Sequence, residues 1–265
     1  MIRELFHIGP LSVSPFGVTL VAAFVVAYLQ LRWGLKRQGI GTEEDASAIL
    51  FWAGLGGIVG GKVYYAILYG DWRLLFDRSG LVFYGGFLLA AALVIWSVRR
   101  RKLPLWPTLD ATALALAPGY AVGRLGCFLV GDDYGVPSDG PWAVTFPVGL
   151  PPTTAAELRR LGAEIPAEVP GDTLLAVHPT QLYETGLALL ILGLGIAWFK
   201  RRPQPGTTLC LVTGLLAIER FGIEFLRVKD DRFFGSFTLA QVLALAILVT
   251  AVALGAARRR RAVAA

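Results

Sequence analysis

Charged side chains and cysteines are scarce in this sequence. Charged residues make up 17% of its 265 residues, whereas a typical soluble domain has roughly 25%. Only two residues are cysteine and two are histidine. The shortage of charge argues against a soluble globular protein, and the mean hydropathy of +0.60 points the same way.

The sequence contains several long apolar runs. A helix needs about 20 apolar residues to cross about 30 Å of hydrocarbon. Runs of about this length, the fifth being the shortest, occur at Gly17–Trp33, Ala46–Tyr69, Leu81–Val98, Leu109–Val130, Leu187–Phe199, Thr207–Leu226 and Leu239–Ala257. They predict an all-α polytopic membrane protein with seven transmembrane helices, forming a single integral membrane domain over residues 1–265.

The distribution of Lys and Arg predicts the orientation of these helices. If the N-terminus is outside, the predicted cytoplasmic segments contain fourteen Lys and Arg and the opposite segments contain seven. Positive residues accumulate in cytoplasmic loops, so we expect the N-terminus outside and the C-terminus in the cytoplasm. This asymmetry beside anionic lipid also explains the net charge of +6, and no nucleic-acid partner is predicted.

The two cysteines are not expected to form a disulfide. In this topology Cys127 lies near the outer end of the fourth span and Cys210 near the inner end of the sixth. Most of a bilayer, roughly 20 Å, would separate them, whereas a disulfide needs Cα atoms within about 7 Å.

The segment GRLGCFLVGDDYG, residues 123–135, places an arginine inside an apolar run. Arg124 is costly in hydrocarbon, and such a residue generally marks a function or a partner. Several glycines in and after this run predict that the fourth helix bends or breaks near its outer end. Irregular backbone at that depth is tolerated where it lines a cavity.

The only long loop covers residues 131–177 and is predicted to be an external head region. Its TTAAELRRLG segment is typical of a short surface helix, with Thr153 or Thr154 as the N-cap. Loops of this length are usually functional, so we interpret it as a partner-facing lid.

Polar residues recur in HPTQLYE, residues 178–184. His178, Gln181 and Glu184 are three apart and are expected to share one face of the following helix. A buried hydrogen-bond network that braces the external side and a direct role in a site both explain this stripe.

The segment ERFGIEFLR places Arg220, Glu224 and Arg227 on one face of the sixth span. Arg220 and Glu224 can neutralise each other. Such local pairing does not explain why two intramembrane arginines, Arg124 and Arg220, occur on different helices. Because guanidinium matches phosphate oxygens in a bidentate way, they predict a clamp for a phosphate-bearing lipid headgroup.

Three of these segments, GRLGCFLVGDDYG, HPTQLYE and ERFGIEFLR, resemble the signature motifs of the prolipoprotein diacylglyceryl transferase family. The order of the spans, the IGPLSVSPFG opening and the YGG start of the third span agree with it. The resemblance implies transfer of a diacylglyceryl group from phosphatidylglycerol to the lipobox cysteine of a preprolipoprotein signal peptide, releasing glycerol phosphate. It also implies a multi-pass protein of the bacterial inner membrane whose site faces the outer leaflet, with no metal or organic cofactor.

The resemblance implies two groups of site residues. Arg124 and Arg220 would hold the phosphodiester and stabilise charge on the leaving phosphate, while Glu184 and Glu224 would orient them. The residues it assigns to catalysis are Arg124, Arg220, Tyr84 and His178. Those it assigns to substrate binding are Arg124, Gly126, Asp132, Gly135, Gln181, Glu184, Glu224 and Arg227.

Some positions differ from the family's usual pattern. Tyr84 stands where a histidine is usual, and tyrosine, with a reference pKa near 10, is poorly suited to general-base catalysis at neutral pH. Cys127 and Val130 replace two asparagines, and Asp132 replaces a glutamate. The alternatives are therefore a divergent member with another acceptor or lipid, or a catalytically silent membrane protein that binds lipid. A further alternative is that Cys127 transiently accepts the lipid.

Overall fold

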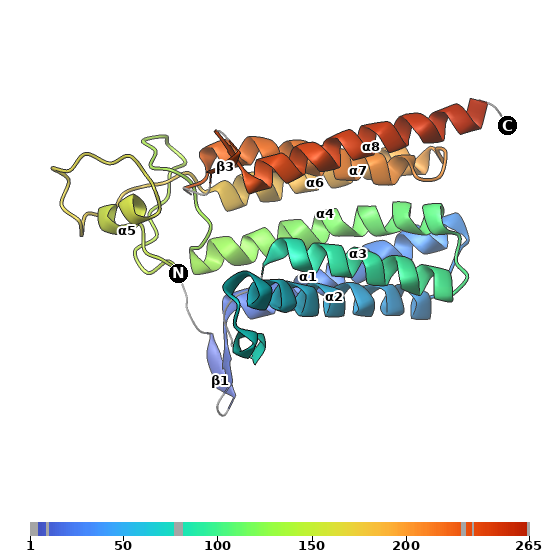
Figure 1. Ribbon diagram of the computed structural model, residues 1–265, viewed down its shortest axis with the longest axis horizontal. Coiled ribbons are helices and arrows are strands. Elements are labelled where there is room, and N and C mark those ends of the chain that lie inside the picture. The colour runs from blue at the N-terminus through green and yellow to red at the C-terminus, as the bar shows by residue number, and fades with distance from the viewer. Residues whose placement is uncertain (1–4, 9–10, 77–81, 229–231, 235, 264–265) are drawn as a thin grey trace. The chain divides into compact units, whose positions relative to one another are not determined.

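The computed structural model describes residues 5–8, 11–76, 82–228, 232–234 and 236–263 (Figure 1). Within these residues, seven long helices overlap the seven predicted runs, and one short helix lies in the long loop. The α-helices within these residues are α1 (Pro15–Gln38), α2 (Glu43–Tyr69), α3 (Phe83–Arg100), α4 (Leu105–Val130), α5 (Ala155–Arg160), α6 (Thr180–Lys200), α7 (Thr207–Ile223) and α8 (Leu239–Val263).

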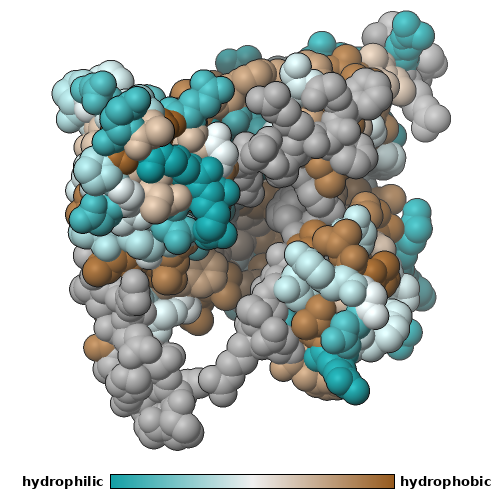
Figure 2. Space-filling model, turned by 60° about the vertical axis from the view of Figure 1, so that its left-hand side comes forward, coloured by the Kyte–Doolittle hydropathy of each residue, from teal (hydrophilic) through white to brown (hydrophobic). Residues whose placement is uncertain are grey.

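Five described helices, α1, α2, α4, α6 and α8, are long and apolar enough to cross a membrane. The most apolar segment, Leu239–Arg260 of α8, has a mean hydropathy of 2.3. Large hydrophobic side chains such as Phe51, Leu88 and Val249 are exposed on the helices, and Figure 2 shows hydrophobic side chains on one face beside patches of hydrophilic ones. The chain is therefore a polytopic membrane protein.

The chain divides into two compact units, which we describe separately. Unit 2 comprises residues 27–112 and contains α2, α3, the 3₁₀ helix η1 (Trp72–Phe76) and parts of α1 and α4. In α2, Thr42 and Asp45 form a reciprocal N-terminal capping box. Glycines allow α2 and α3 to approach closely: a Cβ atom at Gly56 would lie 2.6 Å from the Cα atom of Ala90.

Unit 1 comprises residues 1–26 and 113–265. It contains α5 to α8 and the remaining parts of α1 and α4, and α7 packs against both α6 and α8. Two small antiparallel hairpins belong to it, one of β1 (Phe6–Ile8) and β2 (Leu11–Val13), the other of β3 (Arg232–Phe234) and β4 (Phe237–Thr238). The 3₁₀ helix η2 (Glu224–Leu226) continues α7.

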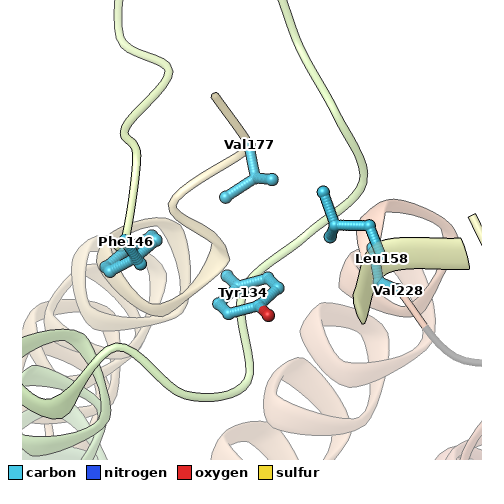
Figure 3. Close-up of a cluster of buried hydrophobic side chains, with 5 residues drawn as sticks. All are labelled: Tyr134, Phe146, Leu158, Val177 and Val228. Atoms are coloured by element: carbon cyan, nitrogen blue, oxygen red, sulfur yellow. The ribbon is translucent and has the colours of Figure 1, made fainter. Parts of the chain in front are cut away.

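Most residues of a small hydrophobic core in unit 1 come from the head region, residues 131–177. Tyr134 and Phe146 stack with ring centroids 5.5 Å apart, and Leu158, Val177 and Val228 complete the cluster (Figure 3). The Tyr134 hydroxyl donates a hydrogen bond to the Pro151 carbonyl at 2.9 Å, and burial raises the pKa of Tyr134 to about 12. The core joins the head region to the segment that follows η2.

The predicted surface helix of the loop is confirmed as α5. Its N-cap is Thr154, whose hydroxyl accepts a hydrogen bond from the backbone of Glu157. The expected bend or break in the fourth span is not a break, because α4 is continuous from Leu105 to Val130 although it contains Pro118. The helix ends at Gly131, whose φ of +71° turns the chain toward the head region.

Candidate functional site

Arg124 lies near the end of α4 and is only 8% exposed. Its Nη1 atom lies 3.0 Å from an oxygen of Asp133, and its Nη2 atom forms an ion pair with Glu184 at the start of α6. Gly131 and Asp133 both have positive φ, which returns the chain over the end of α4 and brings Asp133 back to Arg124. A local turn and a distant helix thus supply the two carboxylates of this buried arginine.

Arg227, just after η2, closes this arrangement into a ring of alternating charge. It forms an ion pair with the second carboxylate oxygen of Asp133, and its Nη1 atom lies 3.9 Å from Glu184. Each carboxylate therefore lies between the same two guanidinium groups. Arg227 and Glu184 are buried, whereas 39% of the Asp133 side chain is exposed. We call Arg124, Asp133, Arg227 and Glu184 the charge ring.

Arg220 is connected to the charge ring through Glu224. Its Nη2 atom lies 2.6 Å from Glu224, which also lies 3.8 Å from the Nε atom of Arg227 and accepts a hydrogen bond from Thr238 at 3.0 Å. Within the described part of the chain, the Nη1 atom of Arg220 has no hydrogen-bond partner. With 29% of its side chain exposed, Arg220 is the more accessible of the two arginines predicted to form the clamp.

The turn that carries Asp132 and Asp133 is held by the first residues of α6. The hydroxyl of Thr180 donates to the Asp133 carbonyl at 2.9 Å, and the amide of Gln181 donates to the Asp132 carbonyl. Gln181 is fully buried, so its contact is with the turn. Burial, reinforced by the neighbouring charge of Asp133, raises the pKa of the Asp132 carboxyl above its usual range.

Gly126 and Gly135, both predicted to contact substrate, mark places of close backbone approach. A Cβ atom at Gly126 would collide with the hydroxyl of Thr19 on α1. One at Gly135 would lie 2.8 Å from the Cβ atom of His178, and the Gly135 amide donates to the His178 carbonyl at 2.9 Å. Both glycines are therefore explained by close packing, Gly126 against α1 and Gly135 against the start of α6.

His178 is not a member of the charge ring. His178 precedes α6, and its Nδ1 atom lies 3.1 Å from the hydroxyl of Tyr183. Its backbone pairs with Gly135 and Val136 of the head region. Tyr84 is the second residue of α3, and its side chain lies outside the described part of the structure.

Sequence reasoning missed three residues that contact the predicted ones. Asp133 was visible as the second carboxylate of GDDYG. Tyr120 lies four residues before Arg124, on the same face of α4, and its hydroxyl donates to Glu184 at 2.8 Å. Glu219 precedes Arg220 in the chain and lies 3.5 Å from the same hydroxyl. Only the fold shows that Tyr120 connects these two glutamates.

The charge ring has the chemistry of a masked anion site. Two guanidinium groups face the two oxygens of one carboxylate, which is the arrangement that a phosphate or phosphodiester also prefers. Because Asp133 is the exposed member, it is the one that an incoming anion would replace. The buried Glu184 would keep both arginines in place during that exchange.

The fold and this site define a class, that of polytopic membrane proteins with a buried arginine–carboxylate site. Residues 3–257 match the family described as prolipoprotein diacylglyceryl transferase. The chain therefore belongs to the prolipoprotein diacylglyceryl transferase family, which confirms the resemblance seen in the sequence. This is a family of transferases of lipoprotein biosynthesis in the bacterial cytoplasmic membrane.

Relatives match nearly the whole chain. A phosphatidylglycerol–prolipoprotein diacylglyceryl transferase of Stenotrophomonas maltophilia (strain R551-3) is 32% identical over 276 residues, covering 96% of this chain and 90% of the relative. A protein described in the same words from Vibrio vulnificus (strain CMCP6) is 29% identical over 262 residues, covering 94% and 88%. A third, from Pseudomonas fluorescens (strain SBW25), is 30% identical over 259 residues, covering 91% and 87%.

Proposed function

We propose that this protein transfers the diacylglyceryl group of phosphatidylglycerol to the thiol of a lipobox cysteine in a preprolipoprotein. The carbon–oxygen bond between the diacylglyceryl group and the phosphate breaks, and a carbon–sulfur bond forms. The thiol proton leaves with the released glycerol phosphate, so atoms and charge balance. Family membership and the relatives' described activity support this reaction.

The observation that carries the proposal is the Asp133 carboxylate between Arg124 and Arg227. A phosphodiester has two non-bridging oxygens and one negative charge, so it can replace this carboxylate without changing the net charge of the ring. Arg220, with its unpartnered Nη1 atom among the described residues, then supplies a third cation as charge grows on the departing phosphate. Glu184 and Glu224 keep the arginines oriented.

The proposed topology has seven spans, with the N-terminus outside and the C-terminus in the cytoplasm. Five of these spans are the helices that are long and apolar enough to cross a membrane. The other two are α3 and α7, which have 18 and 17 residues. The whole chain then forms one membrane domain, and the head region lies outside, where it meets the preprolipoprotein. The charge ring, at the end of α4 nearer the head region, faces the outer leaflet.

Activation of the thiol is assigned to His178, to Tyr84 or to the bound phosphate itself. The histidine lies beside the turn that carries Asp133, because its backbone pairs with Gly135. A histidine is suited to accepting a proton near neutral pH, whereas tyrosine is better suited to donating a hydrogen bond to the phosphate.

The test combines complementation with a chemical readout. A host depleted of its own transferase would express this chain, and diacylglyceryl modification of a model lipobox peptide would be measured as a mass increase. We expect modification that disappears in Arg124→Ala and Arg220→Ala. Arg160→Ala is the matched control, because Arg160 is an exposed arginine of the head region paired with Glu157. Absence of modification by the well-expressed wild-type chain would refute the proposal.

A second candidate function is favoured by one position, Tyr84. If this tyrosine cannot support turnover, the protein is a membrane protein that binds lipid without transferring it. Wild-type protein that binds phosphatidylglycerol but modifies no peptide, together with activity gained in Tyr84→His, would establish this second function.

A further inference from the structure

Tyr120 connects two buried carboxyl groups in the interior of unit 1. Its hydroxyl is 2.8 Å from one oxygen of Glu184 and 3.5 Å from one oxygen of Glu219. The three residues come from α4, α6 and α7 respectively. A phenol hydroxyl carries a single proton, so it can donate to one of these carboxyl groups only.

Glu184 is the group that receives this proton. It is paired with both guanidinium groups of the charge ring, and two cations favour the ionised form of a carboxyl group. Its shorter distance to Tyr120 agrees with a charge-assisted hydrogen bond. The proton of the phenol therefore points to Glu184, and a lone pair of its oxygen points to Glu219.

Glu219 has a different environment. It is 7% exposed, and among the described residues no ion pair within 4.0 Å includes it. Arg220, its neighbour in the chain, is paired with Glu224. A buried carboxylate without an ion-pair partner would be costly, and a negative oxygen facing the lone pair of Tyr120 beside the charged Glu184 would add repulsion.

We infer that Glu219 carries its proton in the resting protein and that Tyr120 and Glu219 are positioning residues of the charge ring. The donors then run in one direction, from the Glu219 carboxyl to the Tyr120 hydroxyl and from there to the Glu184 carboxylate, which holds Arg124. The other charged groups around Glu219 are Arg124 on α4 and Arg220 on α7 itself.

This chain of donors adds a hydrogen bond to Oε1 of Glu184, the oxygen that also lies 3.9 Å from Arg227, while Oε2 pairs with Arg124. When an anion replaces Asp133, Arg124 and Arg227 lose a partner, and Glu184 is the buried group that still holds both. A Glu184 held by Tyr120 keeps the arginines at the spacing that one phosphodiester can bridge. In this second step the inference rests on the proposed function, whereas the protonation of Glu219 does not.

Protonation is tested first, by infrared spectroscopy of the purified protein at neutral pH. A protonated carboxyl group has a carbonyl stretch that a carboxylate lacks. We expect this band in the wild-type protein, its loss in Glu219→Gln and its persistence in Glu157→Gln, a control at a partly exposed glutamate of α5. A wild-type spectrum without the band, or a band that Glu219→Gln leaves unchanged, would overturn the inference.

The positioning role is tested by the pH profile of diacylglyceryl transfer. Glutamine keeps a donor toward Tyr120, so Glu219→Gln should retain activity within about twofold, while Tyr120→Phe and Glu219→Ala should lower kcat by about 10-fold. Wild-type activity should fall at alkaline pH as Glu219 loses its proton, and Glu219→Gln should not show this fall.

Identical pH profiles for wild-type and Glu219→Gln protein, or full activity in Tyr120→Phe, would refute the positioning role. The infrared result needs no turnover, so it separates the two proposals. A protonated Glu219 in a protein without transferase activity would leave the donor chain standing and remove the proposed function.

Discussion

At the scale of single residues, the arginines of this protein are neutralised before any substrate arrives. Arg124 and Arg227 share Asp133 and Glu184. Removing one partner of a buried ion pair generally costs about 3–5 kcal/mol, because the remaining charge stays buried. The ring therefore explains how two arginines are kept in the interior of the protein, and under the proposed function its exposed member, Asp133, is the group that a phosphodiester would replace.

Asp133→Asn should bind phosphatidylglycerol more tightly than the wild-type protein. The substitution removes the negative charge that competes with the phosphodiester but keeps an oxygen that can accept from one arginine. We expect a gain of about 3- to 10-fold in affinity, equivalent to about 0.7–1.4 kcal/mol. Native mass spectrometry in detergent micelles would measure this binding, with a zwitterionic phospholipid as the comparison lipid. Asp139→Asn, an exposed aspartate of the same loop, should change nothing. Unchanged or weaker binding in Asp133→Asn would show that this carboxylate does not occupy the phosphate position.

Asp132 should make stability depend on pH in a direction unusual for aspartate. Its pKa is raised in the folded protein by burial and by Asp133, so its contribution is most favourable below the unfolded pKa of about 3.9 and is lost as pH rises through the higher folded pKa. Asp132→Asn should therefore raise the thermal unfolding midpoint at pH 7, with a smaller or no gain near pH 4. The midpoints of both proteins at the two pH values check this. An equal difference at both would contradict it.

At the scale of elements, apolar runs predicted most of the helices because membrane helices satisfy their own backbone hydrogen bonds. The N-cap of α5 was predicted as Thr153 or Thr154, because a threonine hydroxyl can accept from a free N–H group of the first turn, and it is Thr154. The charge ring was only partly predictable: Arg124, Glu184 and Arg227 were singled out by their position within or beside apolar runs. Asp133 was passed over because its role depends on a turn with positive φ, and Tyr120 because a tyrosine in a span is unremarkable until its partner is known.

The packing of α4 against α1 within unit 1 should depend on Gly126. A Cβ atom there would collide with the Thr19 hydroxyl and lie 3.3 Å from the ring of Phe16. Gly126→Ala should therefore destabilise the protein by about 1–3 kcal/mol, with a lower thermal unfolding midpoint. Gly123→Ala is the matched control one turn earlier, because a Cβ atom there meets nothing within 4 Å. Equal midpoints for the two variants would show that α1 does not pack closely at Gly126.

At the scale of the whole molecule, the family match and the apolar helices fix a multi-pass membrane protein, whereas orientation rests on charge. Fourteen Lys and Arg on one side against seven on the other favour a cytoplasmic location for the first group. Under the proposed function, this orientation places the head region on the side where a translocated preprolipoprotein would emerge. It also requires the first loop, between α1 and α2, to be cytoplasmic, and that requirement can be tested without any activity.

Single cysteines should report this topology in whole cells. In a background of Cys127→Ala and Cys210→Ala, Asp139→Cys places a thiol in the head region, and Glu44→Cys places one in the first turn of α2, where 83% of the native side chain is exposed. A charged maleimide cannot cross the bilayer, because charge is strongly disfavoured in hydrocarbon. We expect it to label Asp139→Cys in cells with a permeable outer envelope and Glu44→Cys only after the cytoplasmic membrane is opened. Labelling in the reverse order would invert the topology and place the head region in the cytoplasm, on the side away from the emerging preprolipoprotein.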